Sequence, residues 1–344
     1  MNLEWDGKFL PPWGIVPSVF RDEVDAGLIP PERWRAPDPT MSRQKQWVTF
    51  VNSMVKTISD HLWPEFIGPA GGQRAQWSGA AADQMVNLTE ADLDLLETLR
   101  VPLEQQVIRD LPIVHAPFLQ SPLCLSHFGF FVLEDGRRDS TDKSHGPMDD
   151  YGLFDTSVKP EVWKRFTNIF WKGIEQKDGT ANFQFKERFQ RPRPYQMARL
   201  FGRPSFSHEY AQTSVSSSLQ SGHALHALMG VSRVMETILE EKIPFSTNNW
   251  EILKQFAVDF GDRRVMAGVH YCTDNLASWI VFMSMADSVL ELPHLQTVKG
   301  HIADAITRKS LVYRMLNQAA SSGGKYEVFR RGLHLLRSLL PASA

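Results

Sequence analysis

The chain has 344 residues, of which 42% are hydrophobic and 22% charged, so it is long and apolar enough to bury a core. Its 37 Lys and Arg residues nearly balance its 39 Asp and Glu residues, which argues against a nucleic-acid binder, because such proteins are usually basic. Cys124 and Cys272 are its only cysteines, which argues against a disulfide framework or a multi-cysteine zinc site.

No apolar run is long enough to span a membrane, and the chain opens without the basic and apolar stretches of a secretory signal. We therefore expect a cytoplasmic protein that does not cross a membrane. The Cys and His residues show no zinc spacing, so we also expect no divalent metal.

The first 45 residues are rich in proline, with Trp5, Trp13 and Trp34 between the prolines. Proline removes backbone donors and ends helices, so residues 1–45 are predicted to form an extended arm. The tryptophans suggest that the arm packs on its own domain or on a partner subunit in a homo-oligomer; a flexible tail is the alternative.

Residues 46–150 are predicted to form a helical region, to which we assign no role. Apolar residues recur at helical spacing from about residue 46 until Pro64 ends the run. Thr89, with Asp92 three positions later, resembles a capping box that opens a helix. The polar, charged stretch 134–150 is typical of an exposed loop.

Residues 151–344 are predicted to form the helical core that carries the chemistry. Apolar periodicity predicts helices over 162–174, 223–241, 249–261, 274–292, 303–316 and 326–340. Strand patterns are scarce, and no glycine-rich phosphate loop occurs. The predicted fold class is mainly α, a helix bundle with a proline-rich N-terminal extension.

A cluster of basic residues between Lys186 and Arg203 is the first candidate site feature. It contains six cations and one acid, in a protein that is otherwise near neutral. Pro192 and Pro194 flank Arg193 and favour extended geometry before them, so a helix carrying Lys186 would end there. Lysine and arginine so placed could grip an oxyanion; a solvated basic surface is the alternative.

The second feature is Ser221, Gly222 and His223, directly before a long apolar-periodic run. Small residues at a helix start present backbone N–H groups and the positive end of the helix dipole, which favours an anion. A histidine in that first turn could give a proton to a leaving group. Taken alone, the pattern is equally typical of an ordinary helix cap.

The third feature contains Arg264, His270 and Asp274. Asp274 follows His270 by four positions, so on a helix both would share one face and the carboxylate would orient the imidazole. Arg264 and His270 are six positions apart and would not share a face of one continuous helix. We therefore infer a helix break at Gly268.

Together, the three features resemble the signature of the phosphatidic acid phosphatase type 2 and vanadium-dependent haloperoxidase superfamily. The matching patterns are Lys-x6-Arg-Pro, Ser-Gly-His and Arg-x5-His-x3-Asp, in this order, and they cover roughly residues 175–290. The resemblance implies a helix bundle of that superfamily's kind. Two positions depart from the pattern: Gln220 replaces the usual proline, and Arg263 replaces the usual serine.

The resemblance also implies a role for each matching residue. Phosphate or vanadate would be bound by Lys186, Arg193, Ser221, Gly222 and Arg264. His270 would attack phosphorus to form a phosphohistidine, or ligate vanadium at the same nitrogen. His223 would act as the general acid and Asp274 would orient His270.

Three functions fit this site. We favour a phosphatase for small phosphate esters that needs no cofactor; a haloperoxidase with bound vanadate, using halide and peroxide, is the alternative. Familiar haloperoxidases carry other residues where this chain has Phe183 and Ser216, which weakens that alternative. A non-catalytic module that binds an anion is the third function. The presence of a nucleophile and an acid argues against it, because binding alone needs neither.

Overall fold

The computed structural model describes residues 80–104, 159–175, 218–266, 268–290 and 292–341, with seven single positions between 186 and 203. Over these residues every regular element is a helix and no strand occurs. This confirms the mainly α class. The proline-rich arm 1–45, the predicted helix after residue 46 and the loop 134–150 lie outside the described residues.

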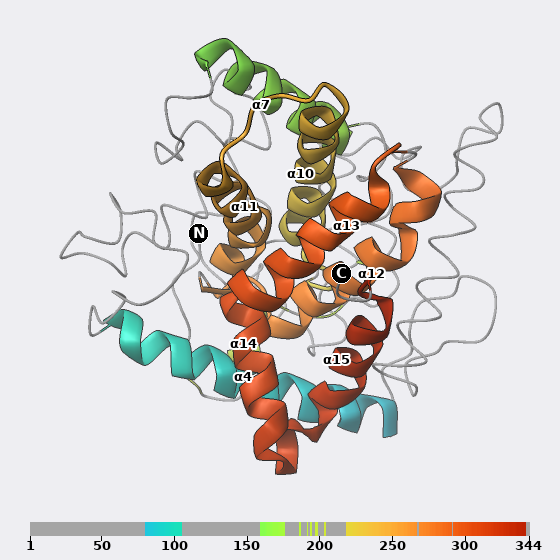
Figure 1. The fold of residues 1–344 in the computed structure, drawn as a ribbon. Helices are drawn as coiled ribbons and strands as arrows, with labels where there is room; N and C mark the ends of the chain where they lie inside the picture. Colours follow the sequence, from blue (N-terminus) through green and yellow to red (C-terminus); the bar gives the residue numbers. More distant parts are fainter. Residues whose placement is uncertain are drawn as a thin grey trace, which may run out of the picture.

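Three helices form the centre of the bundle: α10 (Gly222–Glu240), α11 (Thr247–Met266) and α12 (Cys272–Val289). Helix α10 packs against both of the others. Helix α7 (Pro160–Glu175) covers one end of α10, and α4 (Ala80–Glu104) crosses the opposite end of the bundle (Figure 1). The ends of the central helices nearer α4 carry the site described below.

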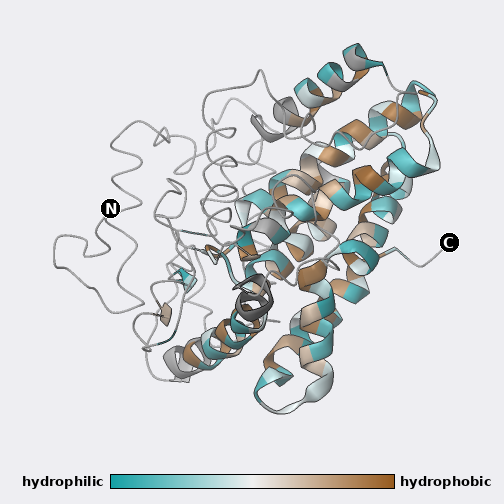
Figure 2. Ribbon diagram, turned by 90° about the vertical axis from the view of Figure 1, so that its left-hand side faces the viewer, coloured by the Kyte–Doolittle hydropathy of each residue, from teal (hydrophilic) through white to brown (hydrophobic). Residues whose placement is uncertain are grey.

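The C-terminal helices pack against the three central helices. They are α13 (Leu295–Asp304), a π-helical turn η3 (Ala305–Lys309), α14 (Leu311–Ser322), a 3₁₀ turn η4 (Gly324–Glu327) and α15 (Val328–Leu339). Figure 2 shows that hydrophobic and hydrophilic residues are interspersed along these helices. Among the described residues, no helix combines the length and apolarity needed to cross a bilayer.

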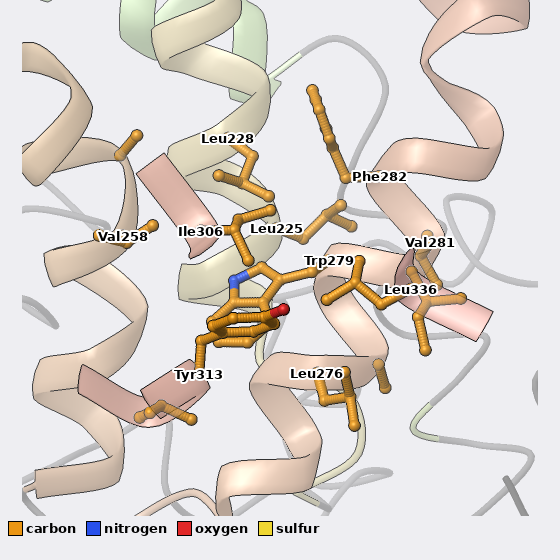
Figure 3. Close-up of a cluster of buried hydrophobic side chains, with 14 of the residues drawn as sticks. Leu225, Leu228, Val258, Leu276, Trp279, Val281, Phe282, Ile306, Tyr313 and Leu336 are labelled. Carbon is orange, nitrogen blue, oxygen red and sulfur yellow. The ribbon is translucent and has the colours of Figure 1, made fainter. Parts of the chain in front are cut away.

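Buried apolar side chains hold α10, α12 and α14 together. Figure 3 shows the indole of Trp279 beside the ring of Tyr313, with Leu225 and Leu228 of α10 and Leu276 of α12 around them. The two rings meet at 60° with centroids 6.3 Å apart, and Trp279 is 1% exposed. Edge contacts of this kind add to the free energy that each ring gains from burial.

The sequence prediction of one helix over 303–316 is wrong, because the chain breaks at Ser310. The Ser310 backbone is extended, and its Oγ accepts a hydrogen bond from Tyr313 N at 3.1 Å, which starts α14. The same hydroxyl donates to the buried Asp262 carboxylate at 2.8 Å. A tertiary partner on α11 therefore fixes a helix boundary that apolar periodicity does not reveal.

The predicted helix start at Thr89 is also wrong, since α4 already begins at Ala80. Thr89 and Asp92 are both buried within the helix. The Asp92 carboxylate contacts residues far along the chain instead of capping its own helix. Helix α13 was not predicted. Helices α7, α10, α11, α12 and α15 lie close to their predicted positions, with ends displaced by a few residues.

Candidate functional site

The residues of the three sequence features lie at the ends of the central helices and in the segment around residue 190, and all are buried. The exposed fraction is 6% for His223, 4% for Lys186 and 2% or less for the other side chains of the set: Arg193, Ser221, Arg264, His270 and Asp274. Gly222 is buried as well. The set comes from two helix starts, one helix end and the segment around residue 190, so the tertiary fold brings it together.

The helix break inferred at Gly268 is confirmed. Helix α11 ends at Met266, and Gly268 has φ 72°, a conformation that favours glycine. The N–H groups of Val269 and His270 then donate to the carbonyl oxygen of Arg264, at 3.2 and 3.3 Å. The chain thus folds back on the end of α11, and His270 comes close to Arg264.

The hydrogen bonds of His270 define which of its nitrogens carries the proton. Arg193 Nη1 lies 2.9 Å from His270 Nε2 and also donates to the Val269 carbonyl oxygen at 2.7 Å. Since a guanidinium can only donate, Nε2 must be the acceptor. His270 Nδ1 lies 3.1 Å from Asp274 Oδ2, so Nδ1 carries the proton and donates to the carboxylate.

The surroundings of His270 keep its ring neutral. Burial holds the pKa of His270 well below its usual range, and the charges of Arg193, Lys186 and Arg264 lower it further. These three cations therefore lie close enough to the ring to act on its protonation. The Nε2 lone pair remains available at neutral pH, in a region of positive potential that favours an oxyanion.

Asp274 approaches His270 from the first turn of α12, so the prediction that both share one helical face is wrong. His270 precedes the helix, which begins at Cys272. Side chains at the third helical position point back toward the N-terminus, and Asp274 Oδ2 accepts from Tyr271 N at 3.0 Å, as in a capping box. The same carboxylate oxygen thereby reaches Nδ1 of His270.

Ser221 caps α10 and ties it to α12. Its Oγ accepts from Ala224 N at 3.3 Å, and its N–H lies 3.4 Å from the carbonyl oxygen of Asp274. Ser278 Oγ lies 2.8 Å from the Ser221 carbonyl oxygen and 2.9 Å from that of Asp274. Gly222 and His223 form the first turn of α10, whose N–H groups have no acceptor within the helix.

His223 lies between the start of α10 and the side of α11. Its ring centroid is 5.1 Å from that of Phe260, and its charge contributes to the lowered pKa of His270. The close approach of the two helices depends on Gly261, where a Cβ would lie 2.6 Å from Ala224 Cβ and 2.9 Å from Ala224 Cα. Any larger residue at 261 would push α11 away from the turn that carries His223.

Sequence reasoning missed the side chains on the far side of Asp274. Arg191 is fully buried, and its Nη1 donates to Asp274 Oδ1 at 2.9 Å. Its Nη2 donates to Asp92 Oδ2 at 2.8 Å. The basic cluster contained Arg191, but the sequence gives no signal that links it to Asp92, 99 positions earlier.

The side chain of Arg263 and the residues Phe183 and Ser216 lie outside the described part of the structure. Gln220 is fully buried. No group of Cys, His, Asp or Glu side chains that could hold a metal ion occurs within the described residues.

Comparison with family models, with curated proteins and with solved structures finds no match to this chain. The geometry of the site combines a neutral imidazole with an oriented lone pair, three cations around it and a second histidine at a helix start. Such an arrangement can bind an oxyanion and transfer a group to nitrogen.

Proposed function

We propose that this protein is a phosphatase that hydrolyses small phosphate esters through a phosphohistidine at His270 and needs no divalent metal. One observation carries the proposal: the hydrogen bond from Nδ1 to Asp274 leaves His270 Nε2 unprotonated, as an acceptor. This is the tautomer that a nucleophilic imidazole requires. Nε2 lies beside Arg193, and the charges of Lys186 and Arg264 also act on the ring. The motif resemblance points to the same chemistry.

In the first step, Nε2 attacks phosphorus while the ester P–O bond breaks. Negative charge develops on the three equatorial oxygens, which Lys186, Arg193 and Arg264 would stabilise. Arg193 would turn its Nη1–H from Nε2 to a substrate oxygen, which frees the lone pair for attack. His223 would give its proton to the leaving oxygen, so the product alcohol departs neutral.

In the second step, water releases the phosphate. His223, now neutral, would take a proton from the attacking water, and the P–N bond to His270 would break. Asp274 holds the Nδ1 proton throughout and stabilises the positive charge on the ring in the intermediate. The proton lost by His223 in the first step is thereby regained, and the site returns to its starting state.

The test is hydrolysis of p-nitrophenyl phosphate, with orthovanadate as a competitive inhibitor. Protein incubated with ³²P-labelled phosphoester and quenched in alkaline denaturant should carry label that is stable in base and lost on later treatment with acid, as expected for phosphohistidine. Activity should be unaffected by EDTA. Label on any residue other than His270, or activity that depends on a divalent ion, would overturn the mechanism.

The same donors would fit vanadate, with His270 Nε2 as its protein ligand and Lys186, Arg193 and Arg264 around its oxygens. Bound vanadate would supply peroxide activation for halide oxidation. A parallel assay of bromide oxidation with vanadate and hydrogen peroxide therefore separates the two functions. Bromide oxidation without phosphoester hydrolysis would replace the phosphatase proposal with the haloperoxidase alternative.

A further inference from the structure

The guanidinium of Arg191 bridges two carboxylates from distant parts of the chain. It donates from Nη1 to Asp274 Oδ1 at 2.9 Å and from Nη2 to Asp92 Oδ2 at 2.8 Å. All three side chains are fully buried. The guanidinium carbon also lies 3.8 Å from the centroid of the Tyr271 ring, so the fork is held in one plane by stacking.

Asp92 also acts on the start of α12. Its Oδ1 accepts from the N–H of Thr273 at 3.2 Å, and its Oδ2 accepts from the Thr273 hydroxyl. Thr273 is the second residue of α12, whose N–H has no acceptor within the helix. A carboxylate from α4 thus stabilises the helix end that carries Asp274.

Both oxygens of Asp274 are engaged by these contacts. Oδ1 accepts from Arg191, while Oδ2 accepts from Tyr271 N and from His270 Nδ1. A carboxylate bonded on both oxygens cannot rotate without losing a buried hydrogen bond. The direction of Oδ2 is therefore fixed by Arg191 on one carboxylate oxygen and by Tyr271 N on the other, and His270 Nδ1 bonds to the oxygen so placed.

We propose that Arg191 and Asp92 are positioning residues for His270, which act through Asp274. The proposal rests on the function proposed above and extends it to α4, a helix outside the three motifs. Buried ion pairs add little net stability compared with apolar packing, so stability alone is a weak reason for a charged fork at this place. Orienting a carboxylate does require arginine, because its planar guanidinium can donate to two carboxylates in fixed directions.

The decisive variant is Arg191→Lys, which keeps the charge but cannot donate in parallel to two carboxylates. We expect kcat for p-nitrophenyl phosphate to fall about 10- to 100-fold, the usual range for partners that orient a catalytic or ligating histidine. KM and the inhibition constant of vanadate should change less than about threefold, because the cations that contact the anion lie on the other edge of the ring. Asp92→Asn should give a smaller loss of kcat of the same kind, since the amide oxygen can still accept from Thr273 N.

The matched control is Asp94→Asn, two positions along α4. Asp94 forms ion pairs with Arg203 and Lys325. Like Asp92→Asn, this variant removes one negative charge from α4, so it should reproduce any effect on stability that comes from losing a carboxylate on this helix. We expect its kcat to equal that of the native protein.

A second measurement does not depend on activity. In protein with ¹⁵N-labelled histidine, the His270 signals, assigned with His270→Gln, should show a protonated Nδ1 and an unprotonated Nε2. Arg191→Lys should yield a mixture of tautomers, whereas Asp94→Asn should keep the native pattern. If Arg191→Lys fails to fold, Asp92→Asn is used for the same comparison.

The outcomes separate the two proposals. Native kcat and a native His270 spectrum in Arg191→Lys would overturn the positioning role. Equal losses in Arg191→Lys and Asp94→Asn would also overturn it, because the effect would then be one of general stability. A changed tautomer in a protein with no phosphatase activity would uphold the positioning role and reject the proposed function.

Discussion

The first turn of α12 and the apolar middle of the same helix are equally buried but are held in different ways. In the first turn, Thr273, Asp274 and Asn275 are 2% exposed or less, and so are Trp279 and Phe282 in the middle. The first group makes directional hydrogen bonds to α4, α11 and the segment around residue 190. The second group packs in the apolar core, where the Trp279 ring meets Tyr313. Burial alone therefore does not distinguish the site from the core; the type of contact does.

This contrast predicts that substitutions in the hydrogen-bonded site change activity and that substitutions in the apolar core change stability. Hydrogen bonds fix direction, which catalysis needs, whereas apolar packing supplies free energy with little regard to direction. Four substitutions in and between these two regions test the contrast.

The largest effect is expected for His270→Ala. Removing the proposed nucleophile should lower kcat about 10⁴-fold or more and abolish the trapped phosphoenzyme. The midpoint of urea unfolding should change little, because the ring contributes little apolar packing. The control is His334→Ala, an exposed histidine on α15, which should retain full activity. Substantial phosphoenzyme in the His270 variant would contradict the assignment.

Trp279→Ala should produce the opposite pattern. The large cavity left next to Tyr313 should lower the free energy of unfolding by about 3–5 kcal/mol, measured by urea titration. Activity per folded molecule should be unchanged. Trp250→Ala, at a half-buried ring that stacks on His301, is the matched control and should cost less. A loss of kcat without a loss of stability would contradict the contrast between the site and the core.

Asp262 gives a pH-dependent test at the border of the two regions. Burial raises the pKa of Asp262 to about 7, although its hydrogen bond from Ser310 opposes this. Between pH 4 and 7 the folded state then keeps a proton that the unfolded state has lost, so its contribution to stability falls as the pH rises. From pH 5 to pH 8 this contribution should decrease by about 2–3 kcal/mol.

The measurement compares urea unfolding of the native protein and of Asp262→Asn at several pH values. The difference in unfolding free energy should change in favour of the variant as the pH rises, because asparagine has no charge to bury. A difference that is constant with pH would contradict the raised pKa.

The smallest effect is expected in the contrast between substrates for His223→Ala. A leaving-group acid matters most for poor leaving groups, so kcat/KM for an alkyl phosphate should fall at least about tenfold more than that for p-nitrophenyl phosphate. The two substrates serve as controls for each other, since a folding defect would lower both equally. Equal losses would remove the acid role from His223.

Much of the site could be predicted from the sequence because its determinants are local. The inferred break at Gly268 depends on a residue type that adopts positive φ easily, and the cap at Ser221 depends on a side chain that bonds three residues ahead. The helices around the motifs follow from apolar periodicity. The ends of these helices are less well predicted, because adding or removing a few residues at an end leaves the apolar periodicity unchanged.

The features that the sequence did not predict depend on contacts between distant parts of the chain. Asp92 matched a local capping pattern, yet its carboxylate bonds to Arg191 and Thr273. The break at Ser310 likewise depends on Asp262, 48 positions away. Local patterns cannot distinguish a polar residue that caps its own helix from one that stabilises another helix, since both occur at the same spacing.

The Ser278 hydroxyl couples the movements of two helix starts in the site. This hydroxyl lies within hydrogen-bond distance of the carbonyl oxygens of both Ser221 and Asp274, and it has one proton to share between them. Two segments more than 50 residues apart therefore share one donor. If the start of α10 moved relative to the start of α12, the hydroxyl would lose one of its two acceptors. We therefore expect the two helix starts to move together.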